Sequence, residues 1–215
     1  MNYGLIGASG KMGQEIIKYF SEQGHTAVFT LDLDGMRQDG IPEILLDFSQ
    51  PQVFDTVLYY VEKFNCPLVS GTTGLSSEQI NLLKKLGDKI PVVQSFSYSK
   101  GIQVLLKCAE ILSSDLPEWD TAISEMHHRH KKDQPSGTAL MIKDALKKEV
   151  PITSQRLGHI PGDHTVFFAG SGEVLSLTHS ATDRRFLAEG ILQACKFLLT
   201  KQSGFHTYKD VVFGG

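Results

Sequence analysis

Apolar and polar residues follow different patterns in the two parts of the chain. Up to about residue 96, short runs of consecutive apolar residues alternate with segments in which apolar residues recur at helical spacing. Such runs predict strands that are buried on both faces, and the segments between them predict amphipathic helices. The predicted strands are residues 3–6, 26–31, 44–48, 67–70 and 91–94, and the predicted helices are residues 12–23 and 76–86, with another starting at 49–51. This alternation predicts an α/β fold with a Rossmann-like, doubly wound parallel sheet.

After about residue 96 the pattern changes, because several of the predicted strands alternate apolar with polar residues. Alternation of this kind is typical of a sheet with one solvated face. The predicted strands are residues 121–126, 153–157, 165–169 and 174–180, and the predicted helices are residues 101–114, 137–148 and 185–199. We therefore predict a second α+β domain with a mixed or antiparallel sheet. The expected boundaries are 1–99, completed by 184–215, for the first domain and 100–183 for the second.

Composition narrows the class of protein. The formal net charge is -3, so no overall positive field attracts nucleic acid or an anionic membrane. The three cysteines are far apart and odd in number, which argues against a disulfide framework. The N-terminus does not resemble a signal peptide, and no apolar run has the length that a bilayer requires. We expect a cytoplasmic protein with no nucleic-acid or membrane partner.

A glycine-rich turn follows the first predicted strand. Gly7, Gly10 and Gly13 have the spacing GxxGxxG, and Ser9 stands where a GxGxxG motif has its middle glycine. Glycines let backbone N–H groups approach a pyrophosphate at the start of a helix. The alternative is a glycine-rich turn that binds nothing.

Asp32, which follows the second predicted strand, favours a nucleotide. An acidic residue at this distance from the glycines accepts hydrogen bonds from an adenosine ribose, although Asp32 and Asp34 could instead be turn formers. The next residue is Leu33, so no adjacent cation holds a 2′-phosphate, and NAD should be at least as acceptable as NADP. Small polar residues also follow two further strands, at residues 47–49 and 71–74, where ligands of parallel sheets bind. A nicotinamide cofactor is the favoured interpretation.

The densest chemistry lies at residues 127–138. Three histidines and three permanent cations occupy residues 127–132, and Ser136-Gly137-Thr138 opens a predicted helix. Proton donors beside a helix N-terminus can hold and protonate a small anion. Two alternatives are a metal site, for which Asp133 is the only near carboxylate, and a solvated basic loop. Three further histidines, His159, His164 and His179, are interpreted as structural.

These motifs together resemble the dihydrodipicolinate reductase family, also called 4-hydroxy-tetrahydrodipicolinate reductase. The resemblance is carried by Gly-x-x-Gly-x-Met-Gly at 7–13, Asp47-Phe48-Ser49, Gly71-Thr72-Thr73-Gly74, and residues 125–139, and it covers essentially the whole chain. It implies reduction of a cyclic imine that bears two carboxylates, with NADH or NADPH, in lysine and diaminopimelate biosynthesis. The first domain would then bind the dinucleotide, and the second would bind substrate and form the interface of a homotetramer.

The resemblance also implies roles for individual residues. His127 would donate the proton and Lys131 would be its cationic partner, while His128, Ser136, Gly137 and Thr138 would bind substrate. No metal is expected. The cofactor would be bound by Gly7, Ala8, Ser9, Gly10, Lys11, Met12, Asp32, Gly71, Thr72, Thr73, Ser95, Phe96, Ser97 and Tyr98. Ser97 departs from the family, which commonly has asparagine there, and its shorter side chain predicts backbone contacts to the cofactor in place of an amide contact.

Two other functions stay open on the sequence alone. One is a different nicotinamide-dependent enzyme of amino-acid metabolism, which would need another acid–base set. The other is a catalytically silent nucleotide-sensing protein on the same fold. The intact His127, Lys131 and Ser136-Gly137-Thr138 set argues against the silent protein.

Overall fold

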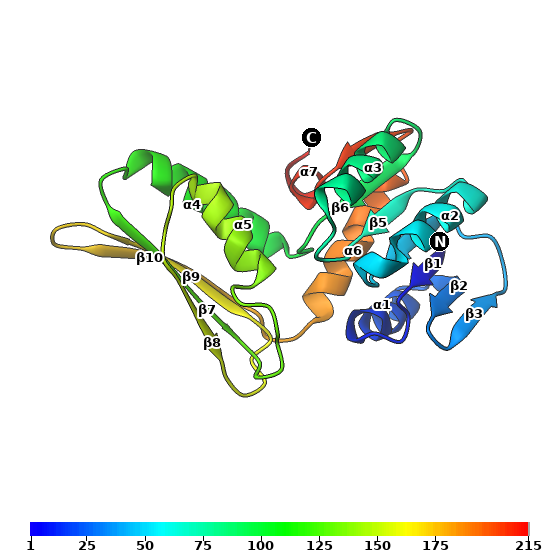
Figure 1. The fold of residues 1–215 in the computed structure, drawn as a ribbon, viewed down its shortest axis with the longest axis horizontal. Coiled ribbons are helices and arrows are strands. Elements are labelled where there is room, and N and C mark those ends of the chain that lie inside the picture. Colours follow the sequence, from blue (N-terminus) through cyan, green and yellow to red (C-terminus); the bar gives the residue numbers. More distant parts are fainter. Residues whose placement is uncertain (215) are drawn as a thin grey trace. The chain divides into compact units, whose positions relative to one another are not determined.

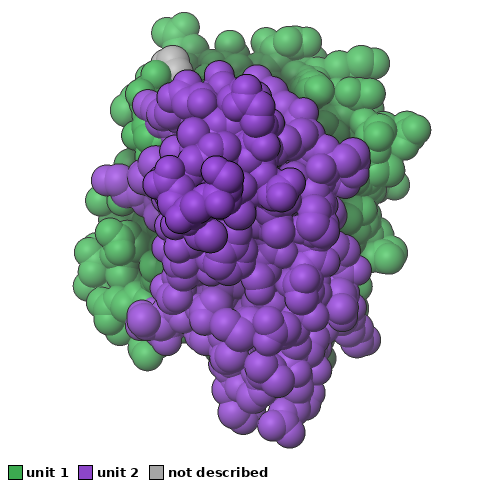
Figure 2. Space-filling view, turned by 90° about the vertical axis from the view of Figure 1, so that its left-hand side faces the viewer, with its two compact units in different colours: residues 1–98, 185–215 green, residues 99–184 purple. Residues whose placement is uncertain are grey.

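The computed structural model describes residues 1–214, which form two compact units (Figures 1 and 2). The first unit comprises Met1–Tyr98 and the C-terminal segment that begins at Arg185, and the second comprises Ser99–Arg184.

The first unit is built on a seven-stranded sheet with the order β11-β6-β5-β4-β1-β2-β3. Its strands are β1 (Asn2–Ile6), β2 (Thr26–Asp32), β3 (Gly35–Gln38), β4 (Ile44–Asp47), β5 (Leu68–Ser70), β6 (Pro91–Gln94) and β11 (Gly204–His206). Every pairing is parallel except that of β2 with β3. The predicted doubly wound sheet is therefore confirmed, with one antiparallel edge strand.

Helices cover both faces of this sheet because successive strand residues point to opposite sides. Leu5 and Leu46 belong to one buried cluster with residues of α1 and α6, whereas Ile6 and Leu45 belong to a second cluster with residues of α2 and α3. The helical elements are α1 (Lys11–Glu22), the 3₁₀ helix η1 (Pro51–Val53), α2 (Phe54–Phe64), α3 (Ser77–Gly87), α6 (Arg185–Leu198) and α7 (Tyr208–Phe213). Two cores, one on each face, explain why the strands read as continuous apolar runs.

The second unit is a four-stranded mixed sheet with the order β10-β9-β7-β8. It contains β7 (Asp120–His127), β8 (Ile152–Arg156), β9 (Asp163–Ala169), β10 (Val174–Ser180), α4 (Lys100–Asp115) and α5 (Gly137–Leu146). β7 pairs parallel with β8 and antiparallel with β9, which confirms the predicted mixed sheet. The two helices pack on one face, where Ile102, Ile142 and Phe168 share a buried cluster.

Two strands escaped the sequence analysis, which was wrong about these segments. β3 consists of four exposed residues without an apolar alternation, and β11 has only three residues in a segment for which no element was predicted. Pairing with a neighbouring strand, which is a tertiary contact, decides such short edge strands. Among the described residues, no helix combines the length and the apolar character that crossing a membrane would need.

Candidate active site

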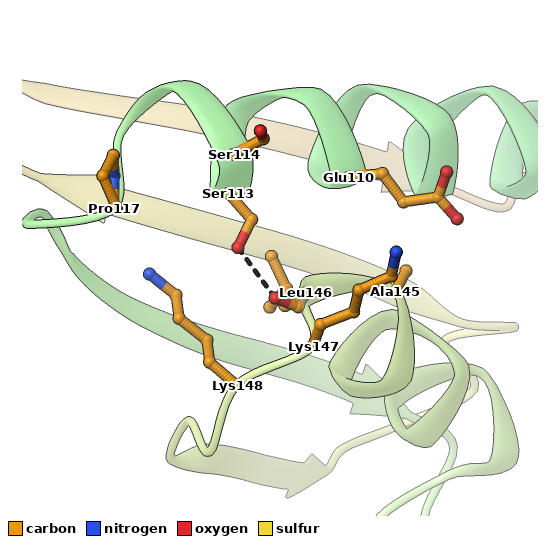
Figure 3. A pocket seen from close by; sticks show the side chains of 8 residues that line it. All are labelled: Glu110, Ser113, Ser114, Pro117, Ala145, Leu146, Lys147 and Lys148. Atoms are coloured by element: carbon orange, nitrogen blue, oxygen red, sulfur yellow. Dashed lines mark hydrogen bonds between the residues drawn. The ribbon is translucent and has the colours of Figure 1, made fainter.

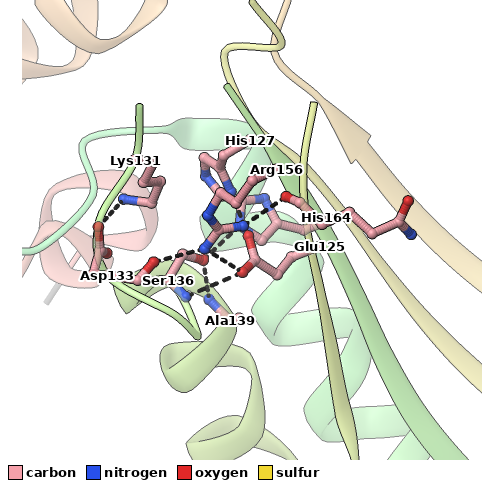
Figure 4. A network of polar contacts seen from close by, with 9 residues as sticks. Glu125, His127, Lys131, Asp133, Ser136, Ala139, Arg156 and His164 are labelled. Carbon is pink, nitrogen blue, oxygen red and sulfur yellow. Dashed lines mark hydrogen bonds and ion pairs between the residues drawn. The ribbon is translucent and has the colours of Figure 1, made fainter. Parts of the chain in front are cut away.

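β7 ends in a buried carboxylate and a buried histidine that touch each other (Figure 4). Ile123, Glu125 and His127 alternate along the strand and are all buried, so they share the face that the helices cover. The Nδ1 atom of His127 is hydrogen-bonded to Oε2 of Glu125. The strand alternation therefore places this pair on the helix-covered face, where the backbone N–H of Ser136, at the start of α5, donates to Glu125 Oε1 at 3.4 Å.

Neighbouring strands complete the environment of Glu125. In the sheet register His127 pairs with Arg156 of β8, and Glu125 pairs with His164 of β9. The Arg156 Nη2 atom donates to Glu125 Oε1 at 2.8 Å and to the backbone oxygen of Asp133 at 2.6 Å. The arginine therefore ties the buried carboxylate to the loop that carries Lys131.

Burial governs the protonation of both histidines. Burial lowers the pKa of His127, and the adjacent Glu125 carboxylate opposes that effect. Burial, with a further contribution from His127, lowers the pKa of His164 to about 3, so this second imidazole is neutral near neutral pH. The two rings lie edge to face with centroids 5.0 Å apart.

The start of α5 is organised by Ser136. Its Oγ accepts a hydrogen bond from the backbone N–H of Ala139 at 3.2 Å and also contacts His164 Nε2 at 3.2 Å. Ser136 is therefore an N-cap whose hydroxyl is already engaged. Gly137 and Thr138 occupy the first turn, where backbone N–H groups have no intrahelical acceptor. The space around the Gly137 Cα is open, so an anion can approach this helix end.

The basic residues in the loop between β7 and α5 differ in how far they are exposed to solvent. Lys131 is partly buried and pairs with Asp133, at 2.8 Å between Nζ and Oδ1. His128 is also partly buried, whereas Arg129, His130 and Lys132 are exposed. The structure thus brings His127, Lys131, Ser136, Gly137 and Thr138 into one loop-and-helix region, with His128 beside it in the chain.

The glycine-rich turn has the shape that a dinucleotide requires. A Cβ atom at Gly13 would overlap the carbonyl oxygen of Gly7, and one at Gly7 would overlap the carbonyl oxygen of Phe48. Gly7 also has φ +88°, a conformation that favours glycine. The N-cap of α1 is Gly10 and makes no side-chain hydrogen bond, so the helix N-terminus is left for another acceptor. Ser9, Gly10 and Lys11 are exposed here, and Ala8 and Met12 are partly exposed.

Asp32 lies at this turn, as predicted. Its carboxylate accepts hydrogen bonds from the backbone N–H groups of Ser9, at 2.6 Å, and Leu33, at 2.8 Å. The hydrogen bond from Ser9 lowers the pKa of Asp32, and the slight burial of Asp32 raises it by less. An ionised acceptor fixed beside the glycine turn suits the hydroxyls of a ribose.

The polar ends of β4 and β5 are joined by Asp47. This buried carboxylate accepts hydrogen bonds from Ser70 Oγ at 3.0 Å and from Thr72 Oγ1 at 2.8 Å, and Ser49 Oγ bonds it as well. Gly71 also packs tightly, because a Cβ there would collide with the Phe48 ring. Thr73 is exposed beside the buried Thr72.

In the segment from Ser95 to Tyr98, three side chains point into the protein. Tyr98 is buried and donates to the backbone oxygen of Ser70 at 2.7 Å, and Ser95 Oγ donates to the backbone oxygen of Ser97 at 2.8 Å. Only Phe96 is exposed. Ser95, Ser97 and Tyr98 can therefore offer a ligand backbone groups more readily than side chains, which lessens the consequence of serine at position 97.

Comparison with known proteins agrees with this architecture. The family model described as "Dihydrodipicolinate reductase, C-terminus" matches residues 101–212, and the one described as "Dihydrodipicolinate reductase, N-terminus" matches residues 25–98. The chain belongs to the dihydrodipicolinate reductase family. The family predicted from the motifs is confirmed.

Individual members of the family match along their whole length. A 4-hydroxy-tetrahydrodipicolinate reductase of Thermosipho africanus is 45% identical over 212 residues, which cover 99% of this chain and 98% of that protein. One from Nitratiruptor sp. is 33% identical over 251 residues, covering 98% of both. A solved structure, a dipicolinate-bound dihydrodipicolinate reductase from Paenisporosarcina sp. TG-14, matches with a TM-score of 0.77 at 22% identity, covering 96% of this chain and 97% of that chain, and supports the fold. Enzymes of this family are oxidoreductases that use NADH or NADPH.

Three further residues belong to the candidate site: Glu125 and Arg156, for which the sequence predicted no role, and His164, which was interpreted as structural. Glu125 could have been found, because it precedes His127 by two residues on a predicted strand and must share its face. Arg156 and His164 come from other strands, so only the pairing register brings them to His127. The expectation that Asp133 is the only carboxylate near the histidines is wrong.

Glu125, His127 and His164 also form the kind of cluster that can hold a metal ion. Their candidate ligand atoms lie within 4.8 Å of one another, and all three residues are buried. However, the Arg156 guanidinium balances the charge of Glu125 Oε1, and His127 bonds the other oxygen. A cation would have to displace both partners, so the cluster suits proton chemistry better than metal binding.

A separate pocket of about 360 Å³ opens between the C-terminal parts of α4 and α5 (Figure 3). Glu110, Ser113 and Lys147 contribute to its lining, and Ser113 Oγ donates to the Leu146 oxygen at 2.8 Å. No predicted site residue lines it, so this pocket belongs to neither candidate ligand.

Proposed function

We propose that this protein reduces 4-hydroxy-tetrahydrodipicolinate, or its dehydrated form dihydrodipicolinate, to tetrahydrodipicolinate. The observation that carries the proposal is the buried Glu125–His127 pair next to the open N-terminus of α5. A proton donor beside groups that bind carboxylates is what reduction of a dicarboxylate imine requires. The relatives named above carry this activity in their names.

The nicotinamide, when bound, supplies a hydride to ring carbon C4. The residues proposed to hold the dinucleotide are Gly7, Ala8, Ser9, Gly10, Lys11, Met12, Asp32, Gly71, Thr72, Thr73, Ser95, Phe96, Ser97 and Tyr98. Asp32 accepts from the ribose, and the glycine turn leaves room for the pyrophosphate beside α1. Because Leu33 follows Asp32, we expect NADH to serve at least as well as NADPH.

The chain's own residues then handle the proton and the two carboxylates. His127 donates its proton to the carbon next to C4, where negative charge develops after the hydride arrives, and the Lys131 ammonium stabilises that charge. His128 contacts one substrate carboxylate. The backbone N–H groups of Gly137 and Thr138 and the Thr138 hydroxyl bind the other, at the helix end that Ser136 caps. The dipicolinate named with the Paenisporosarcina reductase, a ring with two carboxylates, fits this arrangement.

Assembly and domain roles belong to the same proposal. The first unit would bind the dinucleotide, and the second would bind substrate and form a homotetramer through its sheet. On the sheet face opposite the helices, Phe167 and Val174 are exposed to 38% and 68%. A self-complementary contact between copies would cover them. The chain crosses between the units at Tyr98–Ser99 and Arg184–Arg185. We propose the segments around these crossings, residues 97–101 and 182–185, as hinges for domain closure.

The deciding experiment is an assay of NADH and NADPH oxidation with enzymatically generated 4-hydroxy-tetrahydrodipicolinate. We expect at least one cofactor to be oxidised only when substrate is present. The loss of absorbance of the reduced nicotinamide measures this oxidation. Aldehydes and 2-hydroxy acids, the substrates of other nicotinamide enzymes, should give no oxidation or reduction above background. If the protein binds NADH but oxidises neither cofactor, the proposal is wrong, and the catalytically silent nucleotide-sensing protein is favoured.

A further inference from the structure

Glu125 is a buried carboxylate that contacts neither the substrate nor the cofactor in the proposed chemistry. Its residue exposure is 0%, in a unit whose other carboxylates near the site reach solvent. Burying a carboxylate is costly unless hydrogen bonds and an opposite charge compensate it. The way this carboxylate is compensated indicates what it does.

Its two oxygens have separate partners. Oε1 accepts from Arg156 Nη2 at 2.8 Å and from the backbone N–H of Ser136 at 3.4 Å. Oε2 is bonded to His127 Nδ1. The arginine and the N-cap of α5 therefore hold one side of the carboxylate in place, and the other side faces the imidazole (Figure 4).

We propose that Glu125 is a positioning residue for His127: its Oε2 accepts the Nδ1 proton and so reserves Nε2 as the nitrogen that donates to substrate. This inference rests on the proposed function, because it assigns His127 the role of proton donor. The two ring nitrogens are distinct, and the bond made by one decides which tautomer the neutral ring adopts. With Nδ1–H fixed, Nε2 carries the exchangeable proton in the imidazolium and the lone pair in the neutral ring.

The space around Nε2 agrees with that role. A Cβ atom at Gly162 would lie 2.9 Å from His127 Nε2, so glycine at 162 leaves room beside this nitrogen that any other residue would fill. Nδ1 is enclosed by Glu125 on the opposite side of the ring. The imidazole is thus bonded to Glu125 at Nδ1, while Nε2 has free space beside it because residue 162 is glycine.

Charge supports the same assignment. Burial by itself would raise the pKa of Glu125, but the polar groups around its carboxylate, with Arg156 contributing most, lower that pKa to about 2, so the group is an ionised acceptor. The charged and titratable groups that surround His127 are Glu125 on its own strand, Arg156 on β8, His164 on β9 and Lys131 in the loop. Of these, only Glu125 is negative and favours the protonated imidazole.

The test compares Glu125→Gln with a matched control, Glu149→Gln. Glu149 pairs with Lys143 on the surface of the same unit, and its side chain is 91% exposed. We expect Glu125→Gln to lower kcat by roughly 10²-fold, within the range for a lost acid–base contribution, with a smaller change in KM. The fall of kcat/KM at alkaline pH should also begin at lower pH, because the imidazolium loses its negative neighbour. The control should keep the parent pH profile.

A second measurement uses the unaltered protein and so does not depend on how a variant folds. In the proton NMR spectrum we expect a strongly downfield Nδ1–H resonance that disappears in His127→Gln. Absence of that resonance in the parent protein overturns the proposal, as does a Glu125→Gln enzyme with the parent kcat and pH profile. If the parent enzyme oxidises neither cofactor, the proposed function fails, while the resonance still reports on the Glu125–His127 bond.

Discussion

The Lys131 ammonium lies 2.8 Å from the Asp133 carboxylate, so the cation proposed to face substrate is paired with an internal anion. Partial burial opposes ionisation of Asp133, but Lys131 and the backbone N–H groups of Asp133 and Gly137 hold its pKa below the usual range. Asp133 therefore faces two of the groups that we assign to substrate, Lys131 and Gly137. A substrate carboxylate must compete with it.

Replacing Asp133 by asparagine should remove this competition. Asp133 side-chain exposure is 56%, so the ion pair contributes little to stability, about 1 kcal/mol or less. We expect Asp133→Asn to lower KM for the dicarboxylate substrate roughly threefold, a change of about 0.6 kcal/mol. Steady-state kinetics at fixed saturating cofactor measures the change, with Glu149→Gln as a control from a similar surface pair. A raised KM would mean that Asp133 instead holds Lys131 in its binding position.

Replacing His127 by glutamine should separate chemistry from cofactor binding. The variant keeps a polar group but cannot donate an acidic proton, so we expect kcat to fall by roughly 10²–10⁴-fold. Affinity for NADH, measured by fluorescence titration, should change by less than about twofold, since our proposal places the dinucleotide on other residues. The exposed neighbour His130 provides a matched control as His130→Gln. An equal loss of NADH affinity would place His127 at the nucleotide instead.

The pH dependence of the parent enzyme should reflect the buried position of His127. Burial lowers the pKa of this group below the ordinary histidine value, and the reaction needs the protonated form. The rate constant kcat/KM, which reports the free enzyme, should therefore fall as pH rises through a value below about 6.5. A bound dicarboxylate favours the imidazolium, so the fall of kcat should occur at higher pH. A kcat/KM that stays flat over roughly pH 5 to 8 would exclude His127 as the acid.

His164 should make the fold sensitive to acid. Its folded-state pKa is about 3, against an ordinary value of 6.5, so between these values the unfolded chain binds a proton that the folded chain excludes. Stability contributed by the neutral buried ring is complete above pH 6.5 and is lost as pH falls, by up to about 1.4 kcal/mol per pH unit. We expect the thermal midpoint of His164→Gln to fall less than that of the parent between about pH 6.5 and 5.

The exposed His159 supplies the control for this measurement. His159→Gln should show the same pH dependence of the thermal midpoint as the parent protein. The window above pH 5 is chosen because Glu125, with a pKa of about 2, adds its own acid sensitivity only at lower pH. If the thermal midpoint of His164→Gln depends on pH as that of the parent does, the folded protein binds a proton at His164 as readily as the unfolded chain, and the prediction is wrong.

Much of this protein is determined by local sequence. The apolar runs and the glycine turn at Gly7–Gly13 specify strands and helices because both cores demand apolar residues at those positions. The histidine-rich segment and the Ser136 cap are also local, since a loop and the helix that follows it are fixed by adjacent residues. These features sufficed to predict the fold class, the family and the region of the candidate site.

Tertiary structure alone decided how His127 is held. Arg156 and His164 reach it through the registers of β7 with β8 and of β7 with β9, and register depends on which faces of distant strands are buried together. The same holds for β3 and β11, which are strands because they have partners rather than because their residues favour the conformation. The sequence by itself determined which groups the site can use, whereas the pairing of strands determined that a buried carboxylate, an arginine and a second imidazole surround the proposed proton donor.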